Sequence, residues 1–312
     1  MMLKTAFLLI TTGASAFFPV FSSVPLDRSF SASIPVRDES TAFTNVAALD
    51  PFFRQLAAFE SHGHLRPVRI IQYGDSHTKA DLFTGAVRKR LQRDFEGEGS
   101  RLVKTTSYNP SSNDGRTVVY QPLGINGARA KRLSEMSESP GFLQGVSQSR
   151  PDLIVIAYGT NEVTDLDWTV DSYSRMLCGT IARLRSAAPD ASILIIGPPD
   201  RSVVGTGGWV SARRMPLLME AQKRAALIAG AAFWSECDAM GGAGSMNMWV
   251  ARGLGRFDHV HFTANGYDRL AGLFYSDLIN AYRSRSVETP ASRKGLDVRV
   301  MQGVPVTSRK SN

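Results

Sequence analysis

The sequence has 312 residues but only two cysteines, Cys178 and Cys237. So few cysteines exclude a scaffold held together by several disulfide bonds, and no spacing of cysteines and histidines resembles a zinc site. Neither a Walker phosphate loop nor a Gly-x-Gly-x-x-Gly turn follows a strand, so both common nucleotide-binding signatures are missing. After the N-terminal segment no stretch of about 20 uninterrupted apolar residues occurs, which excludes a membrane-spanning helix there.

The sequence also lacks a strong charge of one sign over most of its length. It contains 36 basic and 28 acidic residues, a net charge of +8. The segment from Tyr282 to Asn312 alone holds seven basic and two acidic residues and therefore supplies +5. The rest of the chain is nearly neutral, so a nucleic-acid-binding body is not predicted. The 43% of hydrophobic residues is a normal globular content and excludes a wholly disordered or fibrous chain.

The first 16 residues have the pattern of a secretory signal peptide. Lys4 precedes a short apolar run from Thr5 to Gly13, and Ala14–Ala16 has the Ala-x-Ala form of a cleavage site. The alternative is a buried N-terminal helix. We expect residues 1–16 to be removed on export, which makes the protein periplasmic or secreted. Residues 17–48 contain three prolines among polar residues and are predicted to form a linker or extended arm.

Alternating strands and helices predict a doubly wound, mostly parallel α/β sheet flanked by helices, a three-layer fold within residues 49–282. The helix that opens this domain has Asp50 as its predicted cap and Pro51 in its first turn. The tail, residues 283–312, has no hydrophobic periodicity and is predicted to be disordered. Strands are expected at residues 68–73, 153–158, 192–196 and 231–234, and helices at 78–93, 171–187, 215–228 and 264–282.

The first polar cluster of interest, Gly74–His77, follows a predicted strand and opens a helix. Ser76 would stand at this turn, where backbone N–H groups at the helix start can stabilise a developing oxyanion. Two other interpretations remain open: Ser76 merely caps the helix, or the turn binds phosphate.

The second cluster, Tyr158–Glu162, follows the most apolar strand. The carboxamide of Asn161 can donate a hydrogen bond to an oxyanion without carrying a charge that must be desolvated. The alternative is a loop asparagine that bonds its own backbone.

The third cluster, Asp258–His261, lies in a loop before the last helix. A serine nucleophile needs a neutral imidazole as base, and that imidazole needs an acceptor on its other nitrogen. The spacing of Asp258 and His261 allows the carboxylate to face the ring, whereas side chains of sequence neighbours diverge. His261 is therefore favoured over His259 as the base. His77 is discounted for the same reason, because it directly follows Ser76 in the sequence.

These clusters, in this order, resemble the SGNH (GDSL-type) hydrolase superfamily. Block I is Gly74–His77, with histidine in place of the commoner leucine; block II is Gly124–Gly127, block III is Gly159–Glu162 and block V is Asp258–His261. The stretches Ile71–Asp81 and Ala239–Met246 further resemble the bacterial envelope branch that removes O-acetyl groups from peptidoglycan.

The resemblance implies a role for each matching residue. Ser76 would be the nucleophile, His261 the general base and then acid, and Asp258 the residue that orients the imidazole. The backbone N–H groups of Ser76 and Gly127 and the side-chain amide of Asn161 would form the oxyanion hole. Neither a metal nor an organic cofactor is implied.

The expected function is therefore an exported serine esterase that removes short acyl groups, acetyl above all, from a carbohydrate such as peptidoglycan. An O-acyltransferase would use the same residues, with a sugar hydroxyl in place of water. A non-catalytic carbohydrate-binding protein would have lost some of the five site residues, and all five are present. The basic tail is expected either to contact anionic envelope polymers or to be a solvated extension.

Further features of the sequence concern the loops near the site, two large apolar side chains and the two cysteines. Residues 96–121 and 200–212 are rich in small and polar residues and are predicted to be mobile loops near it. Met246 and Trp249 could shape an acyl or sugar pocket, although core packing is their more common role. In an oxidising compartment Cys178 and Cys237 could form a disulfide, and two separate buried thiols are equally compatible with the sequence.

Overall fold

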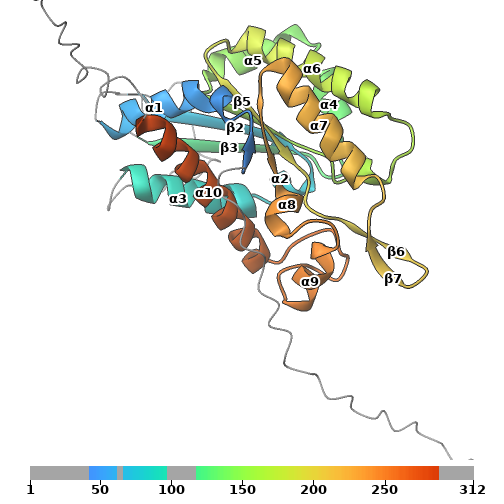
Figure 1. Ribbon diagram of the computed structural model, residues 1–312. Helices are drawn as coiled ribbons and strands as arrows, with labels where there is room; N and C mark the ends of the chain where they lie inside the picture. The colour runs from blue at the N-terminus through green and yellow to red at the C-terminus, as the bar shows by residue number, and fades with distance from the viewer. Residues whose placement is uncertain (1–41, 62–65, 97–116, 288–312) are drawn as a thin grey trace, which may run out of the picture. The chain divides into compact units, whose positions relative to one another are not determined.

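The computed structural model describes residues 42–61, 66–96 and 117–287, all within the unit Arg37–Asn312 (Figure 1). Its main sheet has six strands in the order β1-β8-β5-β4-β2-β3. The strands are β1 Phe43–Thr44, β2 Val68–Gly74, β3 Val118–Gly124, β4 Leu153–Ala157, β5 Ser192–Gly197 and β8 Ala232–Ser235. Only β1 is antiparallel to its neighbour. A separate hairpin is formed by β6 Ser202–Gly205 and β7 Gly208–Ser211.

Helices cover both faces of this sheet (Figure 1). One face carries α1 Asp50–Glu60, α3 Leu82–Glu96 and α10 Ala264–Val287, with the short helices α8 Glu236–Met240 and α9 Ser245–Ala251. The other carries α4 Ala130–Met136, α5 Pro140–Ser149, α6 Val170–Ala187 and α7 Met215–Ala229. The short helix α2 Ser76–Lys79 and the 3₁₀ turns η2 Val46–Leu49 and η4 Glu162–Thr164 complete the described elements.

Alternate residues of each strand explain why both faces need a cover. In β4, Leu153 and Val155 pack in one apolar cluster with α1, α3 and α10, whereas Ile154 and Ile156 pack in the other with α6 and α7. Strands buried on both faces are apolar throughout, as parallel strands usually are. The predicted fold class is confirmed: a mostly parallel sheet lies between two helical layers.

The chain reverses its direction of winding at β2. β3 lies on one side of β2, and the chain then crosses to β4 on the other side. In open α/β sheets the ligand-binding crevice lies beyond the carboxyl ends of the strands at such a reversal. We call this edge of the sheet the carboxyl edge.

Three local predictions differ from the structure. The predicted loop 96–121 includes the start of β3, which was not predicted; Pro122 weakened the strand pattern, but an edge strand tolerates proline. The predicted loop 200–212 contains the β6–β7 hairpin. The helix predicted over 78–93 is two helices, because Asp81 has a φ of 50° between α2 and α3.

The boundaries of the folded unit also differ from those predicted. Residues 42–48, which were assigned to the arm, form β1 and most of η2. Because η2 leads directly into α1, Asp50 is the first residue of α1 rather than its cap. The last helix continues to Val287 instead of ending at Tyr282, and Arg285 forms an ion pair with Asp50. The predicted signal peptide, residues 17–41 and residues 288–312 lie outside the described residues.

The remaining expectations concern buried side chains. Cys178 and Cys237 are both free, and burial raises the pKa of the Cys237 thiol to about 12. Met246 and Trp249 belong to the apolar core, where the Trp249 indole donates to the Met240 carbonyl at 3.0 Å.

Within the described residues, no helix combines the length and apolarity that crossing a membrane requires.

Candidate active site

The loops that carry the predicted site residues meet at the carboxyl edge because three neighbouring strands end there in register. Gly74, the last residue of β2, lies opposite Gly124 at the end of β3 and Ala157 at the end of β4. Ser76 follows the first of these strands, Gly127 the second and Asn161 the third. Three of the five predicted residues, from distant parts of the sequence, are thus placed at one edge.

Glycine is required where β2 turns into α2. A Cβ added to Gly74 would lie 2.0 Å from Thr78 Oγ1 and 2.7 Å from the Ala157 carbonyl oxygen, so any other residue would force the turn apart. Asp75 caps α2 by accepting the His77 N–H at 3.0 Å. Ser76 is therefore the first helical residue and not the cap, which leaves its hydroxyl free for another partner.

That partner is His261. Ser76 Oγ lies 3.0 Å from His261 Nε2, and His261 Nδ1 lies 2.8 Å from Asp258 Oδ2. Both distances are those of good hydrogen bonds. The structure brings Ser76, His261 and Asp258 into one hydrogen-bonded chain across the carboxyl edge.

The loop around Asp258 is built to hold this geometry. Asp258 Oδ1 accepts the N–H groups of Val260 and His261 at 3.0 and 2.9 Å, which leaves Oδ2 for the imidazole. His259, the residue between Asp258 and Val260, has a φ of 55°, a left-handed conformation that is uncommon for histidine. Its ring stacks on Trp209 with centroids 4.0 Å apart and bonds Asn247 through Nδ1 at 2.9 Å, which fixes the turn.

The charge of Asp258 sets the tautomer of His261. Burial works to raise the pKa of Asp258, but the N–H and ring of His261 and the N–H of Val260 outweigh it and hold the pKa below its ordinary value. An ionised carboxylate accepts the Nδ1–H of the imidazole, so Nε2 carries the lone pair. The hydroxyl of Ser76 then donates to Nε2, as a serine activated for nucleophilic attack must.

Gly127 and Asn161 face the same edge with donors to spare. Gly127 has a φ of 71° in a turn closed by the bond from the Ala128 N–H to the Ile125 carbonyl at 3.1 Å, and its own N–H has no acceptor within the described residues. Asn161 Nδ2 donates one hydrogen to the Ala128 carbonyl at 2.9 Å. The second hydrogen of this amide has no acceptor among the described residues.

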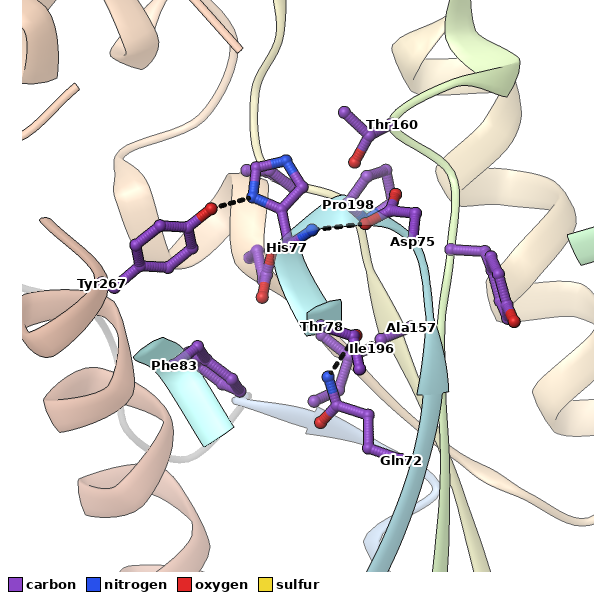
Figure 2. A pocket seen from close by; sticks show the side chains of 13 residues that line it. Gln72, Asp75, His77, Thr78, Phe83, Ala157, Thr160, Ile196, Pro198 and Tyr267 are labelled. Atoms are coloured by element: carbon purple, nitrogen blue, oxygen red, sulfur yellow. Dashed lines mark hydrogen bonds between the residues drawn. The ribbon is translucent and has the colours of Figure 1, made fainter. Parts of the chain in front are cut away.

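A cavity of about 20 Å³ is lined by Asp75 and His77, the residues on either side of Ser76, and Figure 2 shows it from close by. His77 lines it, and its Nδ1 lies 2.9 Å from the Tyr267 hydroxyl (Figure 2). Burial lowers the pKa of His77, and its ring lies 5.2 Å from the His261 ring. His77 is therefore a neutral packing partner of His261. It had been discounted as the base for Ser76 because the side chains of sequence neighbours diverge.

Sequence reasoning missed Tyr267 and Glu236, which also line this cavity. Tyr267 lies in the first turn of α10, and no recognisable motif surrounds either residue. Burial raises the pKa of Glu236 well above its ordinary value, and nearby Asp75 adds to the effect.

Glu162 is another buried carboxyl group at this edge and is 3% exposed. Its Oε1 accepts the Ala130 N–H at 2.7 Å and the Tyr173 hydroxyl at 3.2 Å, which ties η4 to α4 and α6. Burial raises the pKa of Glu162 from 4.5 to about 7, although the Ala130 N–H opposes the shift. The folded protein therefore keeps this proton to a higher pH than the unfolded chain does.

This raised pKa predicts a pH-dependent stability that Glu162→Gln removes. The stabilising contribution of Glu162 is complete below about pH 4.5 and is lost as the pH rises through about 7. A neutral glutamine has no such dependence, so Tm of the variant relative to wild type should rise between pH 5 and pH 8, by the equivalent of at most about 3 kcal/mol. Exposed Glu220→Gln is the matched control. A Tm difference for Glu162→Gln that stays constant over this range would contradict the assignment.

Comparison with known proteins agrees with this geometry. Residues 73–269 match the model of the GDSL-like lipase/acylhydrolase family, a stretch that includes every residue of the candidate site. The chain therefore belongs to this family, and it is a serine esterase of the SGNH type. No curated protein is significantly similar to it in sequence.

Solved structures that are similar to this chain were also found. A peptidoglycan O-acetylesterase superposes with a TM-score of 0.65 and 22% identity over 78% of this chain and 99% of that chain. An alpha/beta hydrolase from the metagenome of Lake Arreo, Spain, gives 0.48 and 15%, over 67% and 94% of the two chains. A variant of an acetyl-xylooligosaccharide esterase from Geobacillus Stearmophilus gives 0.46 and 18%, over 67% and 93%. The first likeness supports the resemblance to peptidoglycan O-acetylesterases at the level of the fold.

Proposed function

We propose that the protein hydrolyses short acyl esters, acetyl above all, on an envelope or extracellular carbohydrate, with Ser76, His261 and Asp258 as its catalytic triad. The observation that carries this proposal is the hydrogen-bonded chain from Ser76 Oγ through His261 to Asp258 Oδ2 at the carboxyl edge. Peptidoglycan is the first candidate polymer, because the stretches Ile71–Asp81 and Ala239–Met246 resemble the esterases that deacetylate it.

The reaction has two steps in this geometry. Ser76 Oγ attacks the ester carbonyl while its proton passes to His261 Nε2; the bond to the sugar oxygen then breaks, and that oxygen takes the proton from Nε2. Water next gives a proton to Nε2 and attacks the acyl-enzyme, which releases the carboxylic acid and returns the proton to Ser76. The N–H groups of Ser76 and Gly127 and the free hydrogen of Asn161 would stabilise the oxyanion in both steps.

Exposed aromatic surface beside the triad supports a carbohydrate substrate. Phe257, which directly precedes Asp258, is 91% exposed, and Trp209 is 40% exposed while its ring stacks on His259. Exposed apolar side chains that gather into a patch mark a binding surface, and these two lie next to Asp258 and His259. The apolar faces of sugar rings fit such flat aromatic surfaces.

The signal peptide pattern of residues 1–16 supports export to the periplasm or beyond, where such polymers occur. The basic residues that follow α10 would add weak attraction to anionic envelope polymers. An O-acyltransferase would use the same triad, with a sugar hydroxyl rather than water reaching the acyl-enzyme. A binding protein that merely retains the fold has no need of the intact hydrogen-bonded chain, which argues against that alternative.

Acetate release from three substrates tests the proposal. Purified protein should release acetate from O-acetylated peptidoglycan or from acetylated xylan faster than it cleaves a long-chain phenyl ester, and Ser76→Ala should release acetate from either polymer at least about 10³-fold more slowly. A preference for the long-chain ester would instead identify a lipase. Transfer of acetyl to added glycan without free acetate would identify an acyltransferase.

A further inference from the structure

Arg201 lies at the carboxyl edge between two loops of the proposed site. It follows β5 in sequence, and the next residue, Ser202, donates its N–H to the His259 carbonyl at 3.1 Å. The Arg201 side chain reaches the other way, and Nη1 donates to the Thr160 carbonyl at 2.6 Å, next to Asn161. Arg201 thus spans the distance from the Asp258–His261 loop to the loop that carries the oxyanion donor.

The guanidinium of Arg201 is poorly compensated for a half-buried charge. Within the described residues it forms no ion pair, and its Nε is buried without an acceptor. Nη2, in contrast, is open and also has no protein acceptor in the described part of the chain. Burial lowers the pKa of Arg201 despite the proximity of Asp165 and Asp258. Arginine nevertheless stays charged in proteins, so this donor is available to an anion.

The nearest carboxylates are already occupied. Asp165 accepts both Nε and Nη2 of Arg129, and Asp258 is held by His261 and two backbone N–H groups. A third cation, Arg214, lies over the Trp168 ring at 4.0 Å and also acts on Asp165. Asp165 therefore has three arginines near it, and among the described residues it forms an ion pair with Arg129 alone, which leaves the Arg201 guanidinium without a carboxylate partner.

We propose that Arg201 binds a carboxylate of the substrate, so that the preferred substrate is an acylated acidic glycan rather than a neutral one. This inference rests on the proposed esterase function and names its substrate class. A guanidinium with one fixed and one open nitrogen binds a carboxylate through a charge-assisted hydrogen bond. The bond to Thr160 orients Arg201 relative to Asn161, so a bound carboxylate would position a neighbouring ester against Ser76.

A matched pair of small substrates tests this directly. Tetra-O-acetylglucuronic acid and its methyl ester differ only in the charge of one group, and their acetyl groups lie at several distances from it. Wild type should have a kcat/KM at least about tenfold higher for the acid. Arg201→Gln should reduce this ratio by at least about tenfold, and Arg201→Lys should retain part of it because the charge remains. Arg54→Gln, an exposed change on α1, should leave the ratio and both rates unchanged.

A second measurement needs no variant. The preference of wild type for the acid should fall as ionic strength is raised from about 0.02 M to about 0.5 M, because salt screens the pair. Equal kcat/KM for acid and ester in wild type, or the wild-type ratio in Arg201→Gln, would overturn the assignment of Arg201 alone. Failure to cleave either sugar while 4-nitrophenyl acetate is cleaved would overturn the carbohydrate proposal and this one with it.

Discussion

Replacement of Ser76 by alanine should reduce ester hydrolysis by at least about 10³-fold, because no acyl-enzyme can form without its hydroxyl. The remaining rate would come from water attacking an ester held by the oxyanion donors. The measurement is the initial rate with 4-nitrophenyl acetate at neutral pH, corrected for the rate without enzyme. KM should change less than kcat, since the small side chain contributes little to ground-state binding.

Ser186→Ala is the matched control, because Ser186 is an exposed serine on α6 outside the site. Its rate should equal that of wild type. Equal rates in Ser76→Ala and wild type would refute the assignment of the nucleophile. The circular dichroism spectrum and Tm of both variants should equal those of wild type. The Ser76 hydroxyl bonds to His261, a residue of a partly exposed loop, so its loss should not weaken the core.

Asp258→Asn should lower kcat by roughly 10³- to 10⁴-fold with little change in the fold. Oδ1 of the asparagine can still accept the N–H groups of Val260 and His261, so the turn should survive. The amide nitrogen would then replace Oδ2 opposite His261 Nδ1, where two donors would face each other. The imidazole avoids this by placing its proton on Nε2, where it can no longer accept the proton of Ser76.

Asp268→Asn makes the same change of charge on α10, where Asp268 pairs with Arg90, and it should retain wild-type kcat. The structural prediction for Asp258→Asn can be checked separately, because a misfolded loop would lower Tm whereas a wrong tautomer would not. Wild-type kcat in Asp258→Asn would show that Asp258 does not orient the base.

Much of the fold could be predicted from the sequence because parallel strands buried on both faces are continuously apolar. β2, β4 and β5 are such strands, and each was predicted to within one residue or so of its bounds. β3 is an edge strand with Pro122 in it, so its pattern was too weak to recognise. The β6–β7 hairpin was missed because its glycines and exposed residues have the composition of a loop.

The site was predictable where a short motif carries its own geometry. Asp258 and His261 lie in one turn, so their spacing was enough to predict that they face each other. The separation of Ser76 from His261 is set by the whole sheet and by α10, and only the resemblance to a family could join them. Arg201 and Glu236 had no such support, because the burial of a charge depends on packing from several elements that no local pattern records.

Labelling with a fluorophosphonate probe tests the central claim most directly, because this reagent forms a covalent bond only with an activated serine hydroxyl. The account predicts that one probe molecule attaches to the peptide containing Ser76, that Asp258→Asn reacts far more slowly, and that Ser76→Ala does not react. Attachment to another serine, or no attachment to an enzyme that still hydrolyses 4-nitrophenyl acetate, would contradict it.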